Sequence, residues 1–102
     1  MIAEFTVIPI GSGESLSPYI AECLRIVKAS GLRYELTATC TIVEGDYDAV
    51  IRTIGDCHKK VRSMSRRAVT SIRIDDREGE SNAMQRKVAS VQEKEQALGK
   101  GR

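Results

Sequence analysis

The chain has 102 residues and a formal net charge of +2, from 16 lysines and arginines against 14 aspartates and glutamates. This length fits one domain, in which about 65% of the unfolded surface becomes buried. The near balance of charge gives a weak overall field, and one phenylalanine, three tyrosines and no tryptophan leave few rings on which bases could stack, so we expect no nucleic-acid partner.

The three cysteines, Cys23, Cys40 and Cys57, contain no Cys-x-x-Cys pair. An odd number without metal spacing favours free thiols in a reducing compartment, so we expect a cytoplasmic protein. The sequence has no apolar run of 18 residues and no basic segment at its start. We therefore expect neither a membrane span nor a signal peptide.

Residues 2–9 are rich in β-forming types and predict a first strand that stops at Pro9. Strict alternation places Ala3, Phe5 and Val7 on one face and Glu4, Thr6 and Ile8 on the other. Ser17 as a cap and Pro18 in the first turn predict a helix that ends at Gly31. Its apolar side is Leu16, Ile20, Cys23, Leu24 and Val27.

Residues 33–44 alternate too far for one short strand, so we divide them into strands 33–38 and 39–44 with a reversal near Ala38-Thr39. Asp46 is expected to cap a second helix. The apolar side of that helix is Tyr47, Val50, Ile51, Ile54, Cys57, His58 and Val61. Residues 67–75 predict a last strand, and a third helix follows Asn82.

The order β-α-β-β-α-β with an added helix predicts an α+β, ferredoxin-like sandwich built on an antiparallel four-stranded sheet. Both helices cover one face of such a sheet, and the other face needs solvent, a ligand or a second subunit. We assign residues 1–98 to this single domain and residues 99–102 to a frayed tail.

No nucleophile and base are recognisable as a pair, so we expect a protein that is not an enzyme and has no cofactor. His58 is the one histidine, and its position on a helix favours a packed or hydrogen-bonded role over a metal ligand or base. The basic stretch from Lys59 to Arg67 fits the C-terminal end of a helix better than a phosphate site.

A set of polar strand residues is the candidate ligand site: Glu4, Thr6, Thr37, Thr39, Thr41, Ser71 and Arg73. Hydroxyls with one acid and one guanidinium can orient a small hydrogen-bonding heterocycle. The alternative is a polar open face or a contact between subunits. Cys40 is either a small packed residue or a pocket wall, and alternation points it away from Thr41.

The sequence resembles the small thiamine-binding protein family over nearly its whole length, to about Val91. The resemblance lies in the segments Ala3-Glu4-Phe5-Thr6-Val7-Ile8-Pro9-Ile10, Ser15-Leu16-Ser17-Pro18-Tyr19-Ile20-Ala21-Glu22, Ser30-Gly31-Leu32, Tyr34-Glu35-Leu36-Thr37, Thr41-Ile42-Val43-Glu44-Gly45-Asp46, Arg67, Val69-Thr70-Ser71-Ile72-Arg73-Ile74-Asp75-Asp76-Arg77 and Lys87-Val88. Their order and spacing carry the resemblance.

The resemblance implies ferredoxin-like domains that pair through their sheets into dimers or tetramers and bind thiamine or its hydroxymethylpyrimidine portion. It places the hydroxyl of Thr41 in the ligand pocket. Where the family tends to have Pro-Met-Gly before this threonine, the chain has Ala38-Thr39-Cys40, which adds a side chain to the wall. Two functions remain open: a non-enzymatic binder of thiamine or a related aminopyrimidine, and an oligomeric interaction or regulatory module without a small ligand.

Overall fold

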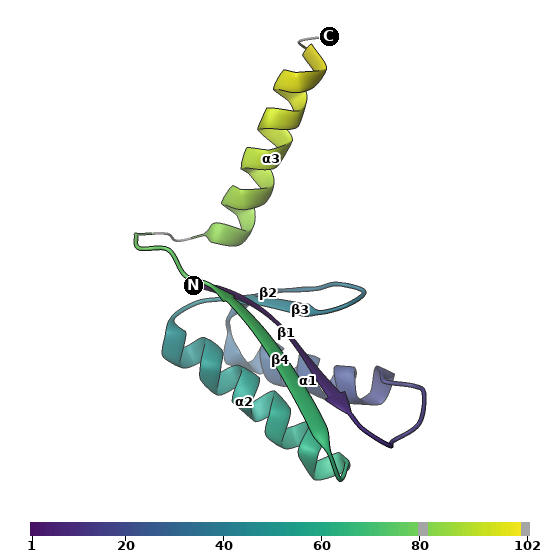
Figure 1. Cartoon of the computed structure of the whole chain (residues 1–102). Coiled ribbons are helices and arrows are strands. Elements are labelled where there is room, and N and C mark those ends of the chain that lie inside the picture. The colour runs from purple at the N-terminus through teal and green to yellow at the C-terminus, as the bar shows by residue number, and fades with distance from the viewer. Residues whose placement is uncertain (80–81, 101–102) are drawn as a thin grey trace.

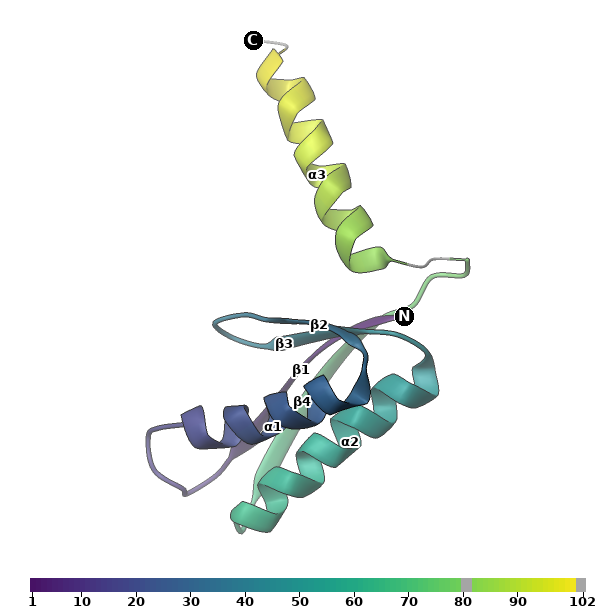
Figure 2. The same cartoon turned by 180° about the vertical axis from the view of Figure 1, so that it is seen from behind.

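A computed structural model describes residues 1–79 and 82–100. The elements are β1 (Ile2–Pro9), α1 (Ser17–Ser30), β2 (Arg33–Leu36), β3 (Thr41–Glu44), α2 (Tyr47–Met64), β4 (Ala68–Asp75) and α3 (Ala83–Lys100). The strands form one antiparallel sheet in the order β2-β3-β1-β4, and α1 and α2 lie side by side on one of its faces (Figures 1 and 2). The expected ferredoxin-like α+β fold is confirmed.

The central strand β1 is buried on one face and open on the other. Ala3, Phe5 and Val7 are only 1%, 3% and 9% exposed, and they point toward the helices. Glu4 and Thr6 lie between them on the open face and remain half-buried. The predicted alternation is therefore confirmed over the whole of β1.

The core forms where α1 and α2 pack on this buried face. Its fully buried members are Val27 of α1, Val43 of β3, and Val50, Ile54, Cys57 and Val61 of α2. The residues from α1 and α2 belong to the predicted apolar sides of the two helices, and Val43 adds the β3 strand to this core. Tyr47 does not follow the prediction, because it starts α2 beyond the edge of the core and is 57% exposed.

The helix ends partly follow the sequence signals. Gly31 ends α1 with a φ of 76°, as expected for a left-handed cap. The prediction that Ser17 caps α1 is wrong: the helix begins one residue earlier, at a cap position held by Leu16, and the Leu16 carbonyl accepts the N–H groups of Tyr19 and Ile20. Asp46 holds the cap position of α2, but its side chain makes no capping hydrogen bond.

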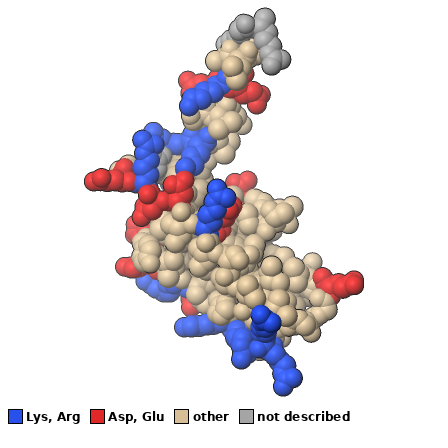
Figure 3. All heavy atoms as spheres, in the orientation of Figure 1, with Lys and Arg blue, Asp and Glu red and all other residues tan. Residues whose placement is uncertain are grey.

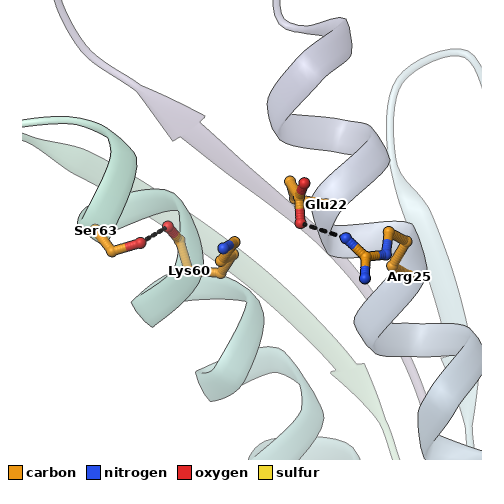
Figure 4. A network of polar contacts seen from close by, with 4 residues as sticks. All are labelled: Glu22, Arg25, Lys60 and Ser63. Carbon is orange, nitrogen blue, oxygen red and sulfur yellow. Dashed lines mark hydrogen bonds and ion pairs between the residues drawn. The ribbon is translucent and has the colours of Figure 1, made fainter.

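The outer faces of the helices carry short-range polar contacts that stay in water. Glu22 and Arg25 of α1 approach to 3.4 Å, and the Ser63 hydroxyl donates to the Lys60 carbonyl of α2 at 2.6 Å (Figure 4). Lysines and arginines also gather where α2 ends, at the bottom of Figure 3, and Arg62 donates there to the Ser65 carbonyl. These contacts fit the expected basic helix terminus.

Helix α3 leaves the body at the end of the sheet where β1 begins (Figure 1). Its first residue, Ala83, is buried, whereas Val88, Val91 and Leu98 are 55%, 66% and 72% exposed. The helix continues to Lys100, so residues 99 and 100 extend it, and residues 101–102 of the expected frayed tail lie outside the described residues. Among the residues that the structure describes, no helix is long and apolar enough to cross a membrane.

Ile54 tests the importance of the core. We expect Ile54→Ala to lower the free energy of unfolding by about 2–5 kcal/mol, because the side chain is 1% exposed and its removal leaves a cavity. The matched control is Ile10→Ala at a side chain that is 42% exposed, which should cost less than about 1 kcal/mol. Urea unfolding measures both, and equal losses would contradict this assignment of the core.

Candidate functional site

An apolar pocket of about 280 Å³ opens between β1, the N-terminal part of α1 and the β2–β3 hairpin. Its walls include Phe5, Leu16, Ile20, Cys23 and Leu36, with threonine hydroxyls on the hairpin side. Ile20 is 41% exposed because it lies on this pocket and not inside the core. We call this space the apolar pocket.

Thr41 stands on the sheet wall of the apolar pocket. The strand register pairs Thr41 of β3 with Phe5 of β1 on one side and with Leu36 of β2 on the other, so all three side chains face the helices. The residue is half-buried. Within the described part of the chain the Thr41 hydroxyl makes no hydrogen bond, which leaves it available to a ligand.

Thr37 has a different task, because its hydroxyl holds the hairpin turn together. The Thr37 Oγ1 atom accepts the N–H groups of Thr39 and Cys40, at 3.3 and 3.1 Å, and donates to the Cys40 carbonyl at 2.9 Å. The backbone N–H of Thr37 also donates to that carbonyl. Thr37 lines the pocket, but its hydroxyl is engaged in shaping the turn.

The remaining predicted residues meet on the opposite, open face of the sheet. There, Glu4 pairs with Arg73 and Thr6 with Ser71 across β1 and β4. They line a shallow hollow of about 300 Å³, which we call the open-face hollow, together with Thr39 and Cys40. Thr6, Thr39 and Cys40 also border the apolar pocket, whereas Glu4, Ser71 and Arg73 do not. The seven polar residues therefore do not converge on one site, because adjacent strand positions alternate between the two faces.

Charges in the open-face hollow neutralise one another. Arg73 and Glu4 form an ion pair at 3.5 Å, and the Cys40 thiol donates to the Glu4 carboxylate at 3.7 Å. The Arg73 side chain is 85% exposed, so this pair is well solvated and contributes little to stability. Cys40 and Thr41 point to opposite faces, as expected.

Glu44 is a functional candidate that sequence reasoning did not single out as a site. Its side chain is 8% exposed, lies 3.6 Å from the Arg33 guanidinium, and accepts the N–H of Met84 at 3.3 Å. It therefore holds the start of α3 against the sheet. The available signal was the position of Glu44 at the end of β3, on the same face as Arg33 of the neighbouring strand.

A second anchor of α3 lies on the surface. Lys87 donates to the Asp75 carboxylate at the end of β4, and this hydrogen bond is the main reason why the pKa of Asp75 is lowered. A carboxyl group whose pKa is lower in the folded than in the unfolded chain stabilises the folded state at pH values above its unfolded pKa. This contribution is lost as the pH falls through the folded pKa. Asp75 is solvent-exposed, so salt screens this contribution.

His58 links α2 to the sheet through a hydrogen bond. The His58 Nδ1 atom lies 2.6 Å from the Thr70 hydroxyl, which ties α2 to β4 and confirms a hydrogen-bonded helix residue. Residues 1–79 and 82–100 contain no group of three or more histidine, cysteine or acidic side chains able to hold a metal ion.

Comparison with known proteins gives consistent matches over most of the chain. The family model described as "Thiamine-binding protein" matches residues 3–92. A UPF0045 protein of Methanocaldococcus jannaschii is 32% identical over 93 residues, covering 91% of this chain and 93% of that protein. A UPF0045 protein of Staphylococcus xylosus is 39% identical over 98 residues, covering 89% and 91%.

Solved structures show the same fold. The crystal structure of the M. jannaschii protein matches with a TM-score of 0.85 and 33% identity, over 90% of this chain and 95% of that one. A Thermotoga maritima structure, described as a putative thiamine biosynthesis/salvage protein, matches with a TM-score of 0.72 at 19% identity, over 82% and 91%. This second likeness concerns the fold alone.

Glu44→Gln tests the anchor of α3. The change removes the charge that faces Arg33 and weakens the acceptor for the Met84 N–H, so we expect a loss of about 1–3 kcal/mol in the free energy of unfolding. Amide hydrogen exchange at Met84 should accelerate at the same time. The control is Glu35→Gln, on the exposed strand β2, and a Glu44 variant that matches this control in both measurements would refute the anchor.

Proposed function

The chain belongs to the thiamine-binding protein family, and from that premise we propose that it is a non-enzymatic binder of thiamine or a related aminopyrimidine, with the ligand in the apolar pocket. One observation carries the proposal. Thr41 presents an unengaged hydroxyl on the wall of a pocket of about 280 Å³ whose other walls are mainly apolar. Ligand sites commonly combine apolar walls with a few polar groups that fix orientation.

The lining of the apolar pocket favours the pyrimidine part of thiamine over the thiazolium part. Phe5 and Leu36 offer apolar surface to a flat ring, and the Thr41 hydroxyl can pair with a ring nitrogen or an amino group. No carboxylate is among the lining residues, and Glu4 lies on the other face of the sheet. A cationic thiazolium therefore belongs at the mouth of the pocket, in water.

Cys40 is among the residues that line the apolar pocket. Its thiol points to the open face, toward Glu4, although its backbone helps to form the turn beside the pocket. Since this thiol is directed toward Glu4, we expect the side chain that replaces the family's glycine to leave the space proposed for the ring open. Free thiols at all three cysteines fit a protein that works in a reducing compartment such as the cytoplasm.

We further propose that the protein self-associates, as a dimer or tetramer, through the open sheet face and α3. Ile8, Val69, Val88 and Val91 leave apolar surface exposed on these two elements of the molecule. Helix α3 touches the body mainly at its first two turns, through Met84 and Lys87, and a solitary helix with an apolar stripe gains stability from a partner.

Calorimetric titration with hydroxymethylpyrimidine and with thiamine tests the pocket. We expect saturable binding that Thr41→Val weakens about 2- to 10-fold, since one hydrogen bond to the ligand is lost while shape is kept. Thr41→Ser should retain most of the affinity. Ser71→Ala is the control, because Ser71 lines the open-face hollow and does not line the apolar pocket.

Two results would count against the binding proposal. Absence of heat with both compounds at ~1 mM would remove the proposed ligand class and favour an interaction module without a small ligand. Equal weakening by Ser71→Ala and Thr41→Val would move the site to the open face.

Self-association is tested by multi-angle light scattering of the full chain and of a Val88→Asp, Val91→Asp double variant. We expect the variant to form a smaller assembly, because two carboxylates on the exposed stripe of α3 oppose burial of that stripe between subunits. A chain that ends before residue 82 gives the same test without α3. If neither change alters the mass of the assembly, α3 is not part of the interface.

A further inference from the structure

Cys23 of α1 and Cys57 of α2 meet where the two helices pack against each other. The Cys23 thiol lies 3.9 Å from the carbonyl oxygen of Cys57, and the Cys57 thiol lies 3.6 Å from the carbonyl oxygen of Cys23. Both thiols are free. This reciprocal contact places both thiols between the two helices, each against the backbone of the other cysteine.

The two thiols differ in access. Cys57 is 0% exposed and belongs entirely to the core, whereas Cys23 is 7% exposed and forms part of the wall of the apolar pocket. A small neutral molecule that enters the pocket therefore meets Cys23 before Cys57. The chain thus has an accessible thiol backed by a shielded one.

The two thiols also differ in acidity. The hydrogen bond with the Cys57 thiol lowers the pKa of Cys23, and it outweighs the opposing effects of burial and of the Glu22 carboxylate. The same hydrogen bond, together with burial, raises the pKa of Cys57. Cys23 also lines the apolar pocket and Cys57 does not, so Cys23 is the thiol of the pair that meets an oxidant first.

We propose that Cys23 and Cys57 are an oxidisable dithiol, in which a peroxide admitted through the apolar pocket oxidises Cys23 and Cys57 then closes an intrachain disulfide. In the first step the Cys23 thiolate attacks one peroxide oxygen, the O–O bond breaks, and a sulfenic acid and hydroxide form. In the second step the Cys57 sulfur displaces that hydroxyl group, and the Cys57 proton leaves with it as water. Overall, two thiols lose two hydrogens and one hydrogen peroxide becomes two waters.

Cys40 is not part of this chemistry. Its thiol faces the other side of the sheet, where it donates to the Glu4 carboxylate. Cys40 therefore serves as an internal comparison for a half-exposed thiol without a partner cysteine.

The disulfide would alter the apolar pocket directly. Cys23 is at once a pocket wall and the contact of α1 with α2, so a bond to Cys57 draws that wall toward the core. Oxidation of the thiol pair is independent of the ligand proposed above, and it holds or fails whatever the pocket binds.

The test uses the full chain carrying Cys40→Ser, which removes disulfides between molecules. After treatment with hydrogen peroxide, quenching and denaturation, iodoacetamide should label no thiol, against two in the untreated protein. Mass spectrometry should show the loss of two hydrogens and a linked peptide pair containing Cys23 and Cys57, and dithiothreitol should restore both thiols. In a Cys40→Ser, Cys57→Ser variant, dimedone should trap a sulfenic acid at Cys23.

Three outcomes would overturn the proposal. The first is two labelled thiols after treatment of a protein that remains folded by circular dichroism. The second is sulfinic or sulfonic acid at Cys23 without the linked pair, which would show that Cys57 does not resolve the intermediate. The third is equal oxidation rates at Cys23 and Cys40 in the unsubstituted chain, because the pocket and the paired thiol would then confer no selectivity.

Discussion

The two-sided pairing of β1 is the constraint on which the rest of the structure depends. Because β1 lies between β3 and β4, its register fixes which residues of both neighbours face the helices. Thr41 faces the helices because it is paired with Phe5, and Arg73 faces the open side because it is paired with Glu4. A shift of one residue would exchange the two faces and would bury a carboxylate in place of a phenyl ring.

The sequence predicts most of this architecture because its periodicities are strong. Alternation along β1 and the helical spacing of Val50, Ile54, Cys57 and Val61 each indicate one buried face, and both are confirmed. Features that depend on tertiary contacts, such as the residue at which a helix begins, are harder to predict from the sequence. Ser17 had the residue type for a cap but not the position, since the helix begins from the carbonyl of Leu16.

The site was harder to predict than the fold, because a set of polar strand residues does not reveal which members share a face until the register is known. Thr41 could be placed on the helix side only once its pairing with Phe5 was fixed, and Thr37 became a turn residue through three local hydrogen bonds. In the sequence, Glu44 is only the last residue of a predicted strand and part of the segment from Thr41 to Asp46. Its role follows from Met84, 40 residues away, whose approach no local pattern reports.

Core and pocket are not separate regions in this molecule, and Cys23 is where they join. A domain of this size has little interior, so the pocket beside β1 is lined by the same helix, α1, that packs against α2. A small thiol suits both tasks: it allows α1 and α2 to approach closely, and it leaves room on the pocket side. A larger side chain at position 23 would fill the pocket or part the helices, so ligand space and core packing must change together.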